Sequence, residues 1–92
     1  MKMLRAGIVG LGLAARAHVK GYETHPQAAV LAVCDLDGER ATRFAAEHQI
    51  PLVYTRYDEM LANPEIDIVD IATPTHLHAA MTKQAALAGK HV

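Results

Sequence analysis

Two glycines and two alanines lie close together near the N-terminus, in the segment Gly10-Leu11-Gly12-Leu13-Ala14-Ala15. This G-x-G-x-x-A spacing suits a phosphate-binding turn between a strand and a helix. Gly10 would allow the tight turn, Gly12 would let a pyrophosphate approach the backbone, and Ala15 would let the helix pack closely on the strand. The amides that open the helix would then face the phosphates with the positive end of the helix dipole. We therefore expect residues of this turn to hold the pyrophosphate of a dinucleotide: Gly10, Leu11, Gly12, Leu13 and Ala14.

An acidic residue follows the glycine turn at a separation along the chain that suits dinucleotide binding. Asp35 lies 25 positions after Gly10 and ends the apolar run 30–34. In that place a carboxylate can accept both ribose hydroxyls of an adenosine and would repel a 2′-phosphate, which favours NAD over NADP as the cofactor. The alternative is that Asp35 only caps the next helix or faces solvent, but Asp37 is better placed to cap. Arg40 could reach a phosphate and support some NADP binding, although a side chain at this helix position more often faces water.

Alternating apolar strands and amphipathic helices surround these residues. Strands are predicted at 3–9, 30–34, 52–54 and 66–72, and helices after Gly12, after Asp37, at 57–62 and after Thr75. Thr75 can cap the last of these helices. The helical stripes consist of Ala15, Val19 and Tyr22, then Ala41, Phe44 and Ala45, and finally Leu77, Met81, Ala85 and Ala88, with Gly89 ending the last helix. Because the chain must return along a helix between parallel strands, this β-α-β-α-β-α-β-α order predicts an α/β, Rossmann-like, doubly wound parallel sheet. With about four strands, the sheet would be incomplete.

Composition excludes several other classes of protein. The 92 residues are 51% apolar and carry a formal charge of −1, with no block of either sign, which excludes a polybasic nucleic-acid binder. The longest apolar runs, at 6–15 and 28–34, are too short to span a membrane. The single cysteine, Cys34, excludes an internal disulfide and favours a reducing compartment. We expect a cytoplasmic protein that binds neither nucleic acid nor membrane, with Cys34 acting as a small buried apolar residue.

The last third of the chain carries a more specific pattern. Residues 68–78 read Ile-Val-Asp-Ile-Ala-Thr-Pro-Thr-His-Leu-His. Together with the glycine turn, Arg16-Ala17-His18 and Val33-Cys34-Asp35, this segment resembles the N-terminal domain of the Gfo/Idh/MocA family, the group of glucose–fructose oxidoreductase and inositol dehydrogenase. The resemblance covers the whole chain in order. It implies that Ala72, Thr73 and Pro74 line the cofactor between ribose and nicotinamide, and that His78 lies near the mouth of the site.

The same resemblance implies a function for a longer protein. In this family a fifth strand leads into a Glu-Lys-Pro signature whose lysine assists proton transfer, and a second domain binds the substrate. Lys90-His91-Val92 matches the lead-in to that signature. We therefore expect residues 1–92 to be a truncated dinucleotide-binding domain without the substrate domain. The parent would transfer hydride between a nicotinamide cofactor and a sugar, polyol or related substrate, while the chain alone, lacking catalytic residues, would be inactive.

Two alternatives to this function remain open. The chain could be a non-catalytic dinucleotide-binding or protein-interaction module of the same fold. It could also self-associate, because Ile68, Val69 and Ile71 would form an unprotected strand edge that recruits another copy or exchanges a terminal element.

Three further polar residues have weaker chemical interpretations. His76 and His78 do not predict a metal site, because residues two apart point about 200° away from each other on a helix. His18 is expected to be a packed or surface residue of the first helix. Asp70 is unusual, since a carboxylate within an apolar strand is costly unless it has a partner. The sequence assigns it no function.

Overall fold

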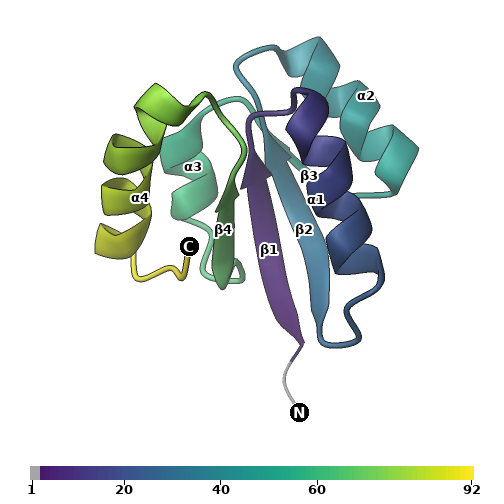
Figure 1. Cartoon of the computed structure of the whole chain (residues 1–92), viewed down its shortest axis with the longest axis horizontal. Coiled ribbons are helices and arrows are strands. Elements are labelled where there is room, and N and C mark those ends of the chain that lie inside the picture. Colours follow the sequence, from purple (N-terminus) through teal and green to yellow (C-terminus); the bar gives the residue numbers. More distant parts are fainter. Residues whose placement is uncertain (1–2) are drawn as a thin grey trace.

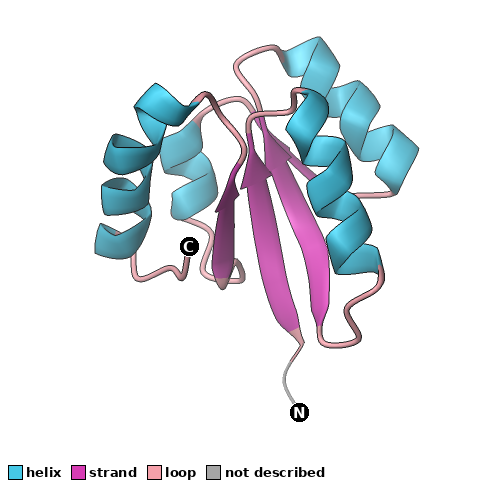
Figure 2. Ribbon diagram, in the orientation of Figure 1, coloured by secondary structure: helices cyan, strands magenta, loops and turns pink. Residues whose placement is uncertain are grey.

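The computed structural model describes residues 3–92, so that the first two residues of the predicted domain lie outside the described part. A four-stranded, entirely parallel sheet forms the centre, with helices on both of its faces (Figures 1 and 2). The strands are β1 (Leu4–Val9), β2 (Ala28–Cys34), β3 (Leu52–Tyr54) and β4 (Ile68–Ile71), in the spatial order β3-β2-β1-β4. The chain therefore reverses direction across the sheet after β3, and β1 and β4 become neighbours. The predicted α/β doubly wound class is confirmed.

Helices alternate with the strands in the predicted order. They are α1 (Leu13–Glu23), α2 (Gly38–His48), α3 (Tyr57–Leu61) and α4 (His78–Leu87), with a short 3₁₀ turn, η1 (Thr75–Leu77), before α4. Three predicted strands have different bounds: β1 begins one residue later, at Leu4, β2 begins two residues earlier, at Ala28, and β4 is shorter than the predicted 66–72. Ile66 lies outside β4 and is nevertheless only 1% exposed. Its apolar character therefore reflects burial in the loop that leads to the strand.

The core consists of two apolar layers, one on each face of the sheet. Successive side chains of a strand point to opposite faces, so Ile8 packs with the α1 and α2 side and Val9 with the α3 and α4 side. The first layer includes Ala15, Val19, Val33 and Phe44, and the second includes Ala32, Met60, Val69 and Ala85. Both layers are mostly aliphatic and thin. None of the helices within residues 3–92 is long and apolar enough to cross a membrane.

The start of the last helix differs from the prediction. Thr75 was expected to cap this helix, but it begins η1, where the Leu77 N–H donates to the Pro74 carbonyl at 3.0 Å. No side chain caps either η1 or α4 within the described residues, so the prediction for Thr75 is wrong. The inserted 3₁₀ turn moves the start of α4 to His78. As a result Leu77 is 40% exposed, whereas Ala85 is buried as predicted.

The C-terminal residues lie along the outer edge of β4. Gly89 ends α4 at a φ of +79°, as predicted for a helix end. His91 then forms a parallel bridge with Ile68, in which the Val69 N–H donates to the His91 carbonyl at 2.8 Å. The chain itself therefore covers the first part of the edge that the sequence left open.

Cys34 provides a test of the buried layer on the α3 and α4 side. Its side chain is 2% exposed, and burial together with the nearby Asp35 carboxylate raises the pKa of the thiol to about 11. We expect iodoacetamide at pH 8 to alkylate the native protein at least about 100-fold more slowly than the unfolded chain, since the thiolate is the reactive form. The thiol's contribution to stability should be complete below pH 9.0 and be lost as pH rises toward about 11. Equal alkylation rates with and without urea would contradict the burial of Cys34.

Candidate functional site

The turn after β1 depends on Gly10 for two reasons. Its φ is +87°, a backbone conformation that side chains with a Cβ rarely adopt. A Cβ at Gly10 would also lie 2.7 Å from Thr73 Cγ2 and 2.8 Å from the Thr73 nitrogen. The Gly10 N–H donates to the Cys34 carbonyl at 2.9 Å, which joins the turn to the end of β2. Gly10 therefore brings together the carboxyl ends of β1, β2 and β4.

Gly12 lies in a different environment. It is the residue before α1, with a φ of −78°, and a Cβ at this position would meet no atom of the described chain within 4 Å. The first turn of α1, which the structure describes in full, carries no acidic side chain, so the positive end of the helix dipole is not neutralised there. Ala15 is fully buried, as its predicted packing role requires. The opening of α1 thus leaves room above Gly12 for an anion.

Asp35 connects the glycine turn to the next helix. Its Oδ2 accepts from the Leu11 N–H at 3.0 Å and its Oδ1 from the Asp37 N–H at 2.8 Å, while its side chain is 12% exposed. Each carboxylate oxygen has two lone pairs, so both oxygens keep capacity for another donor. Asp37 caps α2 as predicted, because its Oδ1 accepts from the amides of Glu39 and Arg40 at 3.1 Å. Asp37, and not Asp35, therefore caps α2.

A cavity of about 600 Å³ opens between the carboxyl ends of β1, β2 and β4. Nine of the ten residues that we predicted for the cofactor line it: Gly10, Leu11, Gly12, Leu13, Ala14, Asp35, Ala72, Thr73 and Pro74. We refer to this cavity as the cleft. Parallel sheets of this class bind ligands at the point where strand order reverses, outside the carboxyl ends of the strands, and the cleft lies at that point.

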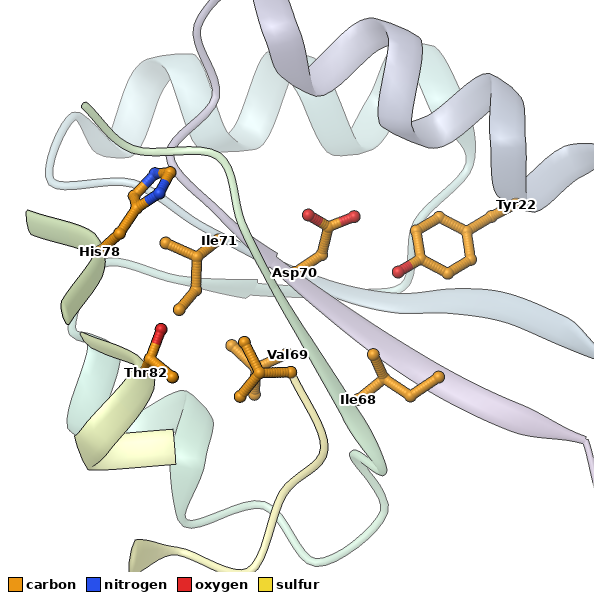
Figure 3. A pocket seen from close by; sticks show the side chains of 8 residues that line it. Tyr22, Ile68, Val69, Asp70, Ile71, His78 and Thr82 are labelled. Atoms are coloured by element: carbon orange, nitrogen blue, oxygen red, sulfur yellow. The ribbon is translucent and has the colours of Figure 1, made fainter. Parts of the chain in front are cut away.

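Two of the predicted residues, Leu11 and His78, make contacts that the sequence analysis does not anticipate. The Leu11 amide is already bound to Asp35 and its side chain is buried, so the free amides of the turn are those that follow it. His78 lines a neighbouring cavity, beside Ile71 and Thr82 (Figure 3). Its Nε2 lies 2.6 Å from the Thr73 carbonyl, and because a carbonyl can only accept, His78 donates this bond. His78 thus holds the loop that carries Thr73.

Several residues of the cleft were not selected from the sequence. Tyr57 and Met81 form part of its lining, and the Tyr57 hydroxyl donates to the Met81 carbonyl at 2.8 Å. Burial raises the pKa of Tyr57 to about 12, so the hydroxyl keeps its proton. The side chains of Leu13 and Leu36 are 92% and 93% exposed where they line the cleft. A lone leucine between two aspartates, Asp35 and Asp37, is a signal that sequence reasoning could have used.

Arginine side chains surround the outer side of the glycine turn. A second cavity, of about 410 Å³, shares Leu11, Gly12, Leu13 and Arg40 with the cleft and is also lined by Arg16, Arg43 and Glu47. Arg16 pairs with Glu47 at 3.3 Å, and Arg40 lies 3.8 Å from Asp35 Oδ2. Arg40 also lies 4.0 Å from an Asp37 carboxylate oxygen, so two of the three guanidinium groups already face carboxylates and the net positive charge beside the turn is small.

The structure shows no metal-binding cluster in its described part. No three side chains of the types His, Cys, Asp and Glu within residues 3–92 come close enough together to hold an ion. His76 lies exposed in η1, and His78 is bonded to the Thr73 carbonyl.

A doubly wound parallel sheet, an open helix N-terminus after a glycine turn and a carboxylate at the end of β2 together define a Rossmann-type dinucleotide-binding domain. Residues 4–92 match the model of the Gfo/Idh/MocA oxidoreductase family, described as an NAD-binding Rossmann fold. The chain belongs to this family, as its sequence pattern predicted.

Known proteins resemble the chain over nearly its whole length. An uncharacterised oxidoreductase of Synechocystis sp. is 37% identical, with 97% of this chain and 24% of the relative covered. The scyllo-inositol dehydrogenase of Lactobacillus casei, solved with bound NAD(H) and scyllo-inositol, superposes with a TM-score of 0.89 at 29% identity, covering 99% of this chain and 27% of the other. A 3-ketoreductase of Actinomadura kijaniata, in complex with TDP-benzene and NADP, gives a TM-score of 0.91 at 30% identity, with coverages of 99% and 29%. The chain thus spans about a quarter of the length of these proteins.

Proposed function

We propose that residues 1–92 hold a nicotinamide dinucleotide for an oxidoreductase that transfers hydride to or from a sugar, polyol or related substrate. The observation that carries this proposal is the bond between the Leu11 amide and Asp35 Oδ2, at 3.0 Å. It fixes the carboxylate that would bind the ribose against the turn, where the open space at Gly12 would accept a pyrophosphate. The NAD(H) and scyllo-inositol of the similar dehydrogenase support the same assignment.

Each part of the cleft suits one part of such a cofactor. The amides at Gly12, Leu13 and Ala14 would hold the pyrophosphate, aided by the dipole of α1. The carboxylate of Asp35 would accept the adenosine ribose hydroxyls. On the other side, Ala72, Thr73 and Pro74 would line the nicotinamide half, with Thr73 held in place by His78. The nicotinamide supplies the hydride chemistry, and these residues bind and orient it.

Calorimetry of the 92-residue chain tests this assignment. We expect heat of binding with NAD and NADH and a single site per chain. A chain that is folded by circular dichroism but binds neither dinucleotide would overturn the proposal. Specific association of such a chain with another protein would then favour the interaction-module alternative.

We propose that the site prefers NAD over NADP, and Asp35 is the residue to test. Asp35→Asn should weaken NAD binding about tenfold or more, because a charged acceptor of two hydroxyls is lost, and should narrow the preference over NADP. Arg40, which lies 3.8 Å from Asp35, would then be free to face a 2′-phosphate. Binding constants for both cofactors provide the measurement.

Asp37→Asn is the matched control for this experiment. Asp37 is the neighbouring carboxylate but caps α2, and asparagine caps a helix about as well as aspartate, so this replacement should change neither the stability nor the ratio of NAD to NADP affinity by much. An unchanged ratio in Asp35→Asn, or an equal change in both variants, would contradict the ribose role of Asp35.

Two further proposals concern the chain by itself. We propose that it binds the cofactor without turnover, which steady NADH formation from any polyol by this chain alone would refute.

We also propose that it self-associates through the part of the β4 edge beyond the His91 bridge. A monomeric mass by light scattering at high micromolar concentration would contradict that proposal.

A further inference from the structure

Asp70 places a carboxylate in the middle of an otherwise apolar strand. It lies between Val69 and Ile71 in β4 and opposite Ile8 of β1, and its side chain is 18% exposed. A carboxylate so far withdrawn from water is costly unless hydrogen-bond donors surround it. The donors for Asp70 come from another element of the fold.

Both partners of Asp70 belong to α1 and lie one helical turn apart. His18 Nδ1 is 2.7 Å from Asp70 Oδ1, and an ionised carboxylate can only accept, so His18 donates. Tyr22 follows four residues later, and Figure 3 shows its hydroxyl directed toward Asp70. Burial, the Asp70 charge and a hydrogen bond to Asp70 raise the pKa of Tyr22 to about 12, so that its hydroxyl stays protonated. Residues four apart share one face of a helix, so the side chains of His18 and Tyr22 both face the same carboxylate.

The two elements joined in this way carry opposite ends of the cleft. The N-terminus of α1 follows Gly12, where the pyrophosphate would lie, and β4 runs directly into 72–74, which would line the nicotinamide half. In the core, α1 packs with the strands β1 and β2 through Ala15, Val19 and their neighbours. The bonds to Asp70 therefore connect the phosphate-binding helix with the strand that positions the other half of the site.

We propose that Asp70, held by His18 and Tyr22, is a positioning residue that sets the spacing between the two halves of the cleft. This inference rests on the proposed function. A dinucleotide must occupy both halves at once, so its affinity depends on the distance and orientation between them. The affinity of a ligand that fills only one half does not depend on that geometry. If the three residues only stabilised the fold, their loss would not distinguish between the two kinds of ligand.

The test compares NADH with ADP, which can occupy only the adenosine and phosphate half. We expect His18→Ala to weaken NADH about tenfold while ADP affinity stays within about twofold. Asparagine places an amide nitrogen close to the position of Nδ1, so His18→Asn should recover most of the NADH affinity. Tyr22→Phe removes one hydroxyl and should weaken NADH about threefold, again without an effect on ADP.

His25→Ala is the matched control. His25 follows α1 and lines one cavity together with His18 and Tyr22, but its Nδ1 accepts from the nearby Gln27 N–H. NADH affinity should not change in this variant. Thermal unfolding of each variant shows that it is folded, and if His18→Ala does not fold, His18→Asn and Tyr22→Phe provide the comparison.

The outcomes separate this inference from the function on which it rests. An unmodified chain that binds neither NADH nor ADP overturns both. An unmodified chain that binds NADH, with variants that keep that affinity or that lose NADH and ADP affinity equally, overturns the positioning role alone.

Discussion

Substitution of Gly10 by alanine is expected to lower the free energy of unfolding by about 2–5 kcal/mol. The new Cβ would lie 2.8 Å from the Thr73 nitrogen, which belongs to the backbone and cannot rotate away. The φ of +87° adds strain that an alanine relieves only by moving the turn. Urea denaturation followed by circular dichroism measures the loss, and dinucleotide affinity should fall together with stability because the turn and the loop at Thr73 both line the cleft.

Gly21→Ala is the control for this substitution. Gly21 lies within α1 at an exposed position, and a Cβ there would meet no described atom within 4 Å. Alanine should therefore stabilise the chain by about 0.5–1 kcal/mol, the usual gain inside a helix. If Gly10→Ala proved as stable as the unmodified chain, the close contact between the glycine turn and Thr73 would be wrong.

Substitution of Gly12 by alanine should produce the opposite combination of effects. The methyl group would project into open space and the φ of −78° suits any residue, so the free energy of unfolding should change by less than about 1 kcal/mol. That same open space is where the pyrophosphate would lie. We expect NADH affinity to fall roughly 10- to 100-fold, which corresponds to about 1.4–2.8 kcal/mol of steric conflict.

Calorimetry with NADH and with ADP measures this second effect. Both ligands carry the pyrophosphate, so both should weaken, in contrast to the variants of His18 and Tyr22. Unchanged affinity for both ligands in a folded Gly12→Ala variant would mean that the phosphates do not lie above this residue. Gly10 is thus expected to be required for stability, and Gly12, two positions later, for binding of the phosphates.

Local sequence patterns predicted the features that depend on neighbours in the chain. The periods of apolar residues indicated the order of strands and helices, and Asp37 and Gly89 marked a helix start and a helix end that the structure confirms. Thr75 failed as a cap because the turn after Pro74 adopts a 3₁₀ conformation before α4 begins. Nothing in the spacing of the Thr75 segment distinguishes a short 3₁₀ turn from the first turn of an α-helix.

The sequence by itself determined the class of fold, the glycine turn and the separate positions of Asp35 and Asp37, because each depends on spacing along the chain. Only the tertiary structure decided where the polar groups of the site go. The Leu11 amide binds a carboxylate 24 positions away, and His18 binds Asp70 across 52 positions. These partners come together because of the strand order β3-β2-β1-β4. This order places β4 beside β1, and the loop after β4 against Gly10. That order arises from packing both faces of the sheet at once, and no local spacing encodes it.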